Sequence, residues 1–167
     1  MFDTSLTMEN QITAMSKAAC LSLRNIGSIR KYLTEDATAT LIHSFVTQRI
    51  DNNNALLNGV PNVQLNRLQR LQNMAARIVT RTKQSDHITP VLADLHWLPV
   101  EQRVSFKVCL IMFKCNQGQA PIYLRDLVDD YTPARSGLRS ADKGLLQEQR
   151  SSTLWGDRSF AIGAVKL

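Results

Sequence analysis

The chain has 167 residues, of which 44% are hydrophobic and 20% charged, with seven glycines and five prolines. This length suits about one domain with a substantial core, and the composition excludes collagen-like, low-complexity and wholly disordered proteins. The formal net charge is +6. No apolar run approaches the ~18 residues of a membrane span. The N-terminal residues lack the features of a secretory signal, so we expect an intracellular protein without membrane contact.

Positive charge is concentrated in the first half of the chain. Ten basic and five acidic residues precede Gln84, whereas ten basic and nine acidic residues lie from Gln84 onward. A polyanion that binds one side of the molecule would explain this contrast. A charged surface that serves only solubility would explain it equally well.

Helical periodicity begins near residue 7 and continues to about residue 33, with a glycine at position 27 that could loosen the helix. Its apolar positions recur at three- and four-residue steps, and they are Met8, Ile12, Met15, Ala19, Leu23 and Ile26. Lys17, Arg24 and Lys31 share the opposite side, within about 40° of one another. Thr34, followed by two acids, predicts the N-cap of a second helix. The apolar face of that helix is Leu41, Ile42, Phe45 and Val46.

A third helix is predicted from about Asn62 to Thr82, after polar turn residues at 51–54 and a break at 58–61. Its apolar face comprises Leu68, Leu71, Ala75, Ile78 and Val79. Beside this face stands a stripe about 80° wide that contains four arginines and no acid, namely Arg67, Arg70, Arg77 and Arg81. A solvated helix face usually mixes both signs of charge, so this stripe is a focused signal for an anionic partner.

Short helices and turns are predicted beyond Lys83. Thr89 and Pro90 are typical of the N-cap and first position of a short helix. Residues 100–116 are apolar nearly all round, apart from a narrow charged strip, which predicts a helix buried at the centre of a bundle. Gly118 should end that helix, a short helix should follow at 122–128, and residues 131–143 should form a surface loop. The segment 144–167 could hold a short strand and a helix fragment, and its apolar end suggests a truncated chain.

The sequence contains no recognisable catalytic or metal-binding motif. Its three cysteines, at 20, 109 and 115, lack the close pairing of zinc ligands and are predicted to be reduced core thiols. His43, His87 and His96 lack partners at a recognisable spacing. Asp129 and Asp130 are adjacent, but they follow a predicted helix, whereas two-metal catalysis needs carboxylates gathered from separate strands. We therefore predict neither a catalytic site nor a metal site.

An ordered series of phrases resembles non-LTR (LINE-type) retrotransposon reverse transcriptases of the jockey and chicken-repeat-like clades. The resemblance covers nearly the whole chain and lies in the region that follows the polymerase palm. Its phrases are RNIGSIRKYL (24–33), NALLNG (54–59), LNRLQRLQN (65–73), AARIVT (75–80), HITPVL (87–92), LHWLPVEQR (95–103), DKGLL (142–146) and WGDR (155–158). Two departures stand out. The family usually shows Asp-Tyr-Cys-Asn where this chain has DNNN (51–54), and it continues with a Trp-containing stretch past residue 167. They suggest a drifting copy and a truncated reading frame.

The resemblance implies the thumb and connection region of an RNA-directed DNA polymerase, a helical bundle that grips the template–primer duplex. The family's catalytic aspartates lie upstream in the palm, and the parent polymerase would need Mg²⁺. The fragment itself is therefore expected to be no enzyme, to take no small-molecule substrate, and to have the duplex and the palm domain as partners. As part of a retroelement ribonucleoprotein, it would occur in the nucleus and the cytoplasm.

Residues and resemblance together predict an all-α bundle of about five to seven helices. Its segments are a basic thumb-like bundle (1–83), apolar helices that complete it (84–130) and a loop-rich, truncated end (131–167). The predicted core includes Ile26, Leu41, Phe45, Leu68, Leu71, Ile78, Val104, Val108 and Ile111. The predicted function is a sequence-independent grip on duplex phosphates through Lys17, Arg24, Lys31, Arg67, Arg70, Arg77, Arg81 and Lys83. A protein-interaction module that binds an acidic partner, an inactive remnant and a merely solvated stripe are the alternatives.

Overall fold

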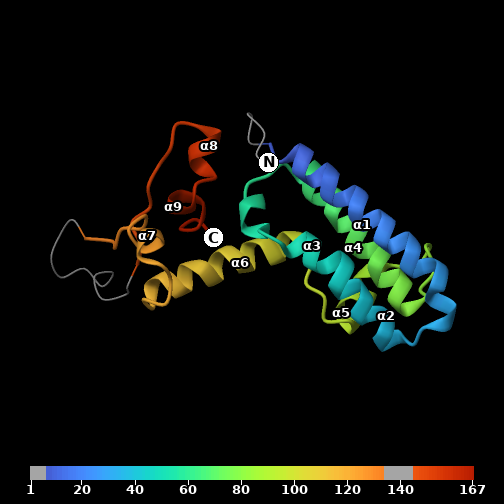
Figure 1. Ribbon diagram of the computed structural model, residues 1–167. Helices are drawn as coiled ribbons and strands as arrows, with labels where there is room; N and C mark the ends of the chain where they lie inside the picture. Colours follow the sequence, from blue (N-terminus) through green and yellow to red (C-terminus); the bar gives the residue numbers. More distant parts are fainter. Residues whose placement is uncertain (1–6, 134–144) are drawn as a thin grey trace. The chain divides into compact units, whose positions relative to one another are not determined.

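The computed structural model describes residues 7–133 and 145–167, and its architecture is all-α, as predicted (Figure 1). No strand forms within those residues, where the one β-type pairing is an isolated bridge between Asp130 and Leu146. The chain divides into two compact units, one that ends at Val104 and one that begins at Ser105. From residue 134 onward, the surface loop predicted at 131–143 lies outside the described residues.

The first helix, α1 (Glu9–Ile29), continues into a 3₁₀ turn, η1 (Arg30–Tyr32). Gly27 stays helical, so the expected loosening does not occur there. The apolar positions predicted for this helix face the core, where Ile12, Ala19, Leu23 and Ile26 are buried. An amphipathic pattern alone therefore located this helix to within a few residues.

The second helical stretch consists of α2 (Glu35–Ile42), a π-helical segment η2 (His43–Thr47) and α3 (Gln48–Asp51). The predicted cap is confirmed, because the Thr34 hydroxyl accepts a hydrogen bond of 3.2 Å from the amide of Ala37. The predicted burial of Phe45 is wrong, since its side chain is 49% exposed. The wider π-helical turn shifts the inward face to a four-residue spacing, so the buried side chains are Thr38, Ile42, Val46 and Ile50.

A short 3₁₀ helix, η3 (Asn54–Leu57), leads to α4 (Asn62–Thr80) and then to α5 (Ile88–Asp94), which packs on α4. The helix α4 agrees with its predicted bounds to within two residues. The start predicted for α5 is wrong, because His87 is the N-cap and Thr89 lies inside the helix. Pro90 is still accommodated, because the first four amides of a helix have no intrahelical acceptor.

The core of the first unit agrees with most of the predicted positions. Ile26, Leu68, Leu71 and Val104 are buried. Leu41 and Ile78 are half-buried and pack against the core cluster. Lys83, after which the charge balance of the sequence changes, lies inside the first unit, because α5 and the start of α6 belong with α1 to α4.

In the second unit, the continuation of α6 (Val100–Asn116) is less buried than predicted. Val108 is buried and Ile111 half-buried, but Phe106 and Phe113 are 61% and 57% exposed, so this helix is not enclosed on all sides. Gly118, with φ of +67°, ends the helix in a left-handed turn, as predicted. The remaining helices are α7 (Ile122–Arg125), α8 (Leu154–Asp157) and α9 (Phe160–Gly163).

Candidate nucleic-acid interface

The helices α1 and α4 lie side by side and run in the same direction (Figure 1). Near their starts, Nη1 of Arg67 lies 3.3 Å from the hydroxyl of Thr13. Near their ends, the guanidinium of Arg30 donates to the carbonyls of Ile78 and Val79, each at 2.7 Å. Because both contacts join residues about 50 positions apart, the two helices are parallel along their whole contact.

The cations predicted on α1 stand beside its contact with α4. Thr13 and Gly27 are positions of α1 that approach α4. Lys17 lies four residues after Thr13 and Lys31 four residues after Gly27. Arg24 lies three residues before Gly27. Residues three or four apart are neighbours on a helix surface. All three cations are exposed, and the Lys31 ammonium lies 4.8 Å from the centre of the Tyr32 ring.

Two of the predicted arginines on α4 point away from the core. Arg70 is exposed, and within the described part of the chain its side chain has no hydrogen bond or ion pair. Arg81 follows the last residue of α4, with φ of 57°, and its guanidinium donates to the Arg30 carbonyl at 3.2 Å. Arg70 therefore keeps all its donors for a ligand, and Arg81 keeps most of them.

The other two arginines of α4 have structural partners. Arg67, half-buried, donates to the side chains of Thr13 and Gln64. Arg77 donates through Nη2 to the carbonyls of Gln84 and Asp86, at 3.3 and 2.8 Å, while its Nη1 is buried without a partner. Its guanidinium thus holds the loop that follows α4, a role that the charge pattern did not reveal.

We call the eight predicted residues the basic face, namely Lys17, Arg24, Lys31, Arg67, Arg70, Arg77, Arg81 and Lys83. Lys83 is exposed in the loop after α4. Where the structure describes side chains, the ion pairs are Arg103–Asp51, Arg125–Asp130 and Lys166–Asp157, and none involves the basic face. Its charge is therefore not neutralised by acids of the described chain.

Arg30 is a cation whose role the sequence pattern missed. It closes the C-terminus of α4 by donating to two carbonyls there and to the carbonyl of Leu33. The last four carbonyls of a helix lack intrahelical donors, so this side chain replaces the amides that usually satisfy them. The two α4 carbonyls lie 48 and 49 residues away, so no local signal could have identified them.

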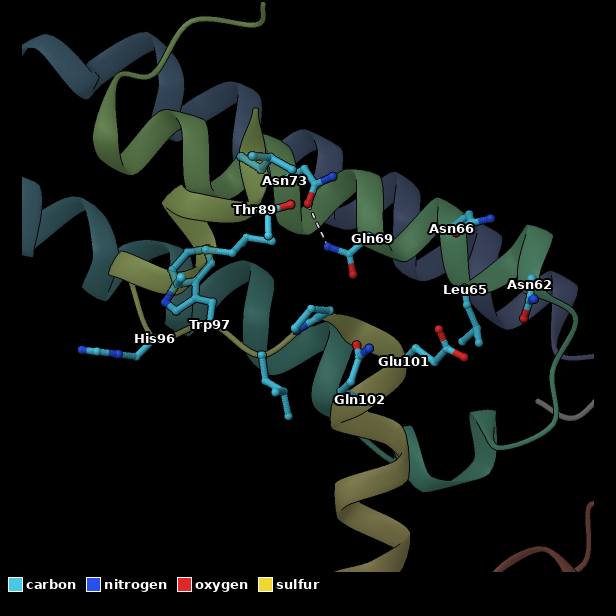
Figure 2. Close-up of a pocket in the computed structure, with 15 residues that line it drawn as sticks. Asn62, Leu65, Asn66, Gln69, Asn73, Thr89, His96, Trp97, Glu101 and Gln102 are labelled. Atoms are coloured by element: carbon cyan, nitrogen blue, oxygen red, sulfur yellow. Dashed lines mark hydrogen bonds between the residues drawn. The ribbon is translucent and has the colours of Figure 1, made fainter. Parts of the chain in front are cut away.

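An open groove of about 770 Å³ adjoins the other flank of α4 and was not predicted from the sequence (Figure 2). It lies between α4, α5, the turn at 95–99 and the first turn of α6. Figure 2 shows Glu101 and Gln102 on α6 across from the α4 amides, and the ring of His96 pointing away from them. Trp97 is buried in its wall and meets His43 edge-on, with ring centres 5.2 Å apart.

The polar lining of the groove consists mostly of uncharged carboxamides. Gln69 is already used, because it accepts from the amide of Val100 and donates to Gln72 and Asn73. By contrast, the side chains of Asn62, Asn66 and Gln102 are exposed and form no hydrogen bond with the described residues. The groove contains no lysine or arginine, and Glu101 is its one carboxylate. The sequence feature that could have indicated the groove is the recurrence of carboxamide side chains at positions 62, 66, 69 and 73 on one side of α4.

The described residues do not fit a magnesium site. No group of three or more His, Cys, Asp or Glu side chains among them gathers closely enough to hold a metal ion. Asp129 accepts from Gln149 at 3.0 Å and Asp130 pairs with Arg125 at 2.6 Å, both on the surface. Cys20 and Cys109 are exposed, so only Cys115 is the buried thiol that was predicted for all three. None of the described helices is long and apolar enough to span a bilayer.

Comparisons with known proteins add no relative: no protein-family model, curated protein or solved structure matches this chain.

Proposed function

We propose that this chain is the thumb segment of an RNA-directed DNA polymerase from a non-LTR retrotransposon, and that its basic face holds the template–primer duplex by the phosphates. The proposal gives the chain a binding role and leaves Mg²⁺-dependent catalysis to the palm of the parent polymerase. It is supported by the ordered phrases that resemble this family and by the chemistry of the basic face. A role within a retroelement ribonucleoprotein, in nucleus and cytoplasm, is part of the same proposal.

The observation that carries the proposal is a pair of cation rows on two parallel helices, in which Lys17, Arg24, Lys31, Arg70 and Arg81 are exposed. Lys17 to Lys31 and Arg67 to Arg81 each cover fourteen residues, or about 21 Å at the helical rise of 1.5 Å per residue. Duplex nucleic acid presents one charge per ~1.7 Å of axis, so about twelve phosphates lie within that length. The length of each row and the sign of its charge are therefore compatible with contact to a short stretch of duplex.

Phosphate contact suits a polymerase thumb, because the duplex that it holds changes sequence at every step. Arginine and lysine bind phosphate oxygens without reading the bases. A face that read sequence would instead place side chains against base edges in a groove. Tyr32, 77% exposed, is the one aromatic side chain beside the described basic face, so stacking of successive bases along it is not supported.

A second candidate function, a protein-interaction module, is favoured by one observation in the second unit. Phe106, Phe113 and Ile122 are more than half exposed and lie on α6 and α7. Large apolar side chains that are this exposed often mark contacts between proteins. If the partner were instead an acidic protein bound to the arginines, duplex RNA–DNA would not displace it.

The decisive experiment compares Arg70→Gln with wild type on a 20-base-pair RNA–DNA duplex of several sequences. Losing one exposed, unpaired cation should weaken binding about three- to tenfold, equivalent to ~1 kcal/mol, and by the same factor for every sequence. The slope of log K against log salt should become shallower by about one. Fluorescence anisotropy between 50 and 300 mM salt measures both quantities.

Arg49→Gln provides the matched control. Arg49 is also an exposed arginine, but it lies on α3, outside the eight residues of the basic face, and donates to the Phe45 carbonyl at 3.0 Å. Its loss should leave affinity within about twofold and the salt slope unchanged, because it contacts no phosphate in this proposal. Equal losses for both variants, or a strong preference for one sequence, would mean that the basic face is not a phosphate grip.

A further inference from the structure

The groove and the basic face share a border along α4. Asn66 precedes Arg70 by four residues and Asn73 follows it by three, so the amides and the arginine are neighbours on the helix surface. Arg77 follows Asn73 by four residues in the same way. A ligand on the basic face therefore reaches the groove without crossing any other element.

The two surfaces differ in charge. The basic face is a row of cations, whereas the groove offers neutral amides, a threonine hydroxyl and apolar side chains, with a single carboxylate at Glu101. A single nucleic-acid strand has the complementary division, because its phosphates form an anionic edge and its bases are neutral rings with hydrogen-bonding groups. Asparagine and glutamine match base edges well, since each carboxamide both donates and accepts.

We propose that the groove takes unpaired bases of the nucleic acid whose duplex part rests on the basic face. The strand's phosphates would stay beside Arg70, and its bases would turn toward Asn66, Asn73 and Gln102. Of these, Asn66 and Gln102 have all their hydrogen-bonding groups free of the described residues. The cavity, at about 770 Å³, lies in the range of ~300–1,000 Å³ common for small-ligand sites.

This inference rests on the proposed function and names its ligand as a duplex with a single-stranded extension. An extended peptide could also bond to carboxamides through its main chain. It lacks the anionic edge, however, and so would leave the adjoining cations unused. The charge division therefore favours a nucleic-acid strand over a peptide.

The experiment measures the affinity of the full chain for three probes. They are a blunt 16-base-pair RNA–DNA duplex, the same duplex with a four-nucleotide single-stranded extension, and the same with an abasic extension. We expect the extension with bases to tighten binding about fivefold over the blunt duplex. The abasic extension carries the same phosphates, so it should give little of that gain.

The test variant is Asn66→Ala combined with Gln102→Ala, which removes two exposed amides and no charge. It should bind the blunt duplex within twofold of wild type and lose the gain from the extension. Asn10→Ala with Gln48→Ala, two exposed amides outside the groove, should keep that gain. Unfolding in urea should be unchanged for both variants, which excludes misfolding as the cause.

The remaining outcomes separate this inference from the proposed function. If wild type binds the blunt duplex but gains nothing from the extension, the inference is wrong and the groove is left to a ligand without phosphates, such as a peptide. The inference is equally wrong if the abasic extension gives the same gain or the test variant keeps the gain. If no duplex binds at all, the proposed function itself is wrong.

Discussion

The four arginines of α4 carry the same charge but differ in what their guanidinium groups already contact. Arg70 extends into solvent, whereas Arg77 holds the loop after the helix by the carbonyls of Gln84 and Asp86. A guanidinium has five donors, so Arg77 could still contribute charge to the surface while two protein carbonyls occupy Nη2. We therefore expect Arg77 to contribute to both binding and stability, and Arg70 to contribute to binding alone.

Arg77→Gln should lower the free energy of unfolding by about 1 kcal/mol, because the loop loses its charged donor. Arg70→Gln should leave that free energy within ~0.5 kcal/mol, as is usual for exposed positions without partners. Urea titrations followed by circular dichroism at 222 nm measure both. Equal midpoints for the two variants would contradict the anchoring role of Arg77.

At the same scale, helical spacing places the arginines of α4 in one stripe, but it does not show which of them already contact protein groups. The charges of Arg67, Arg70 and Arg77 follow from helical spacing, which is a local property. The partners of Arg77 lie seven and nine residues on, in a loop without periodicity, and two of the three carbonyls that Arg30 contacts lie on another helix. Such contacts depend on tertiary structure, which neither charge nor hydropathy encodes in one stretch of chain.

Among the elements, the π-helical turn η2 decides which side of the second helical stretch is buried. An α-helical register would place Phe45 inside together with Ile42 and Val46, but with the wider turn Ile42 and Val46 are buried and Phe45 is exposed. Ile42→Ala should therefore cost about 2–4 kcal/mol, and Phe45→Ala less than about 1 kcal/mol. Thermal and urea unfolding of the two variants would test this, and a larger cost for Phe45 would restore the α-helical register.

Gly27 and Gly118 should respond oppositely to alanine. A Cβ at Gly27 would lie 3.9 Å from Ile78, an ordinary contact in a helix interior, so Gly27→Ala should stabilise the protein by about 0.5–1 kcal/mol. Gly118 has φ of +67° with open space around it, so Gly118→Ala should cost ~1 kcal/mol through backbone strain alone. Calorimetric unfolding temperatures check both signs, and a destabilising Gly27→Ala would mean that α1 and α4 lie closer than described.

Element bounds were largely predictable, because long amphipathic runs leave a clear period. The apolar residues at 100–116 predicted the bounds of α6 correctly. The burial of this helix was overestimated, because Phe106 and Phe113 are apolar but exposed. Apolar character predicts where a helix forms, whereas burial depends on what packs against it. The groove beside α4 was missed for a related reason, since its walls come from α4, α5, the turn at 95–99 and α6, which are separated in sequence.

For the whole molecule, the distribution of charge sets a limit on how strongly salt should affect binding. Six cations of the basic face are exposed and, among the described residues, form no ion pair, and Arg81 alone of the six donates to a protein carbonyl. They are Lys17, Arg24, Lys31, Arg70, Arg81 and Lys83. Each phosphate contact contributes a slope of about −0.9 in a plot of log K against log salt.

The full chain should therefore bind a 20-base-pair RNA–DNA duplex with a slope of about −4 to −5, because six contacts give at most about −5.4 and a straight face misses some phosphates. Anisotropy titrations between 50 and 300 mM NaCl measure this slope, with duplexes of three unrelated sequences as the control for sequence independence. A slope steeper than about −7 would require cations outside the basic face, including those of the second unit. A slope near zero would show that the affinity does not come from phosphates, and the duplex grip would then be wrong.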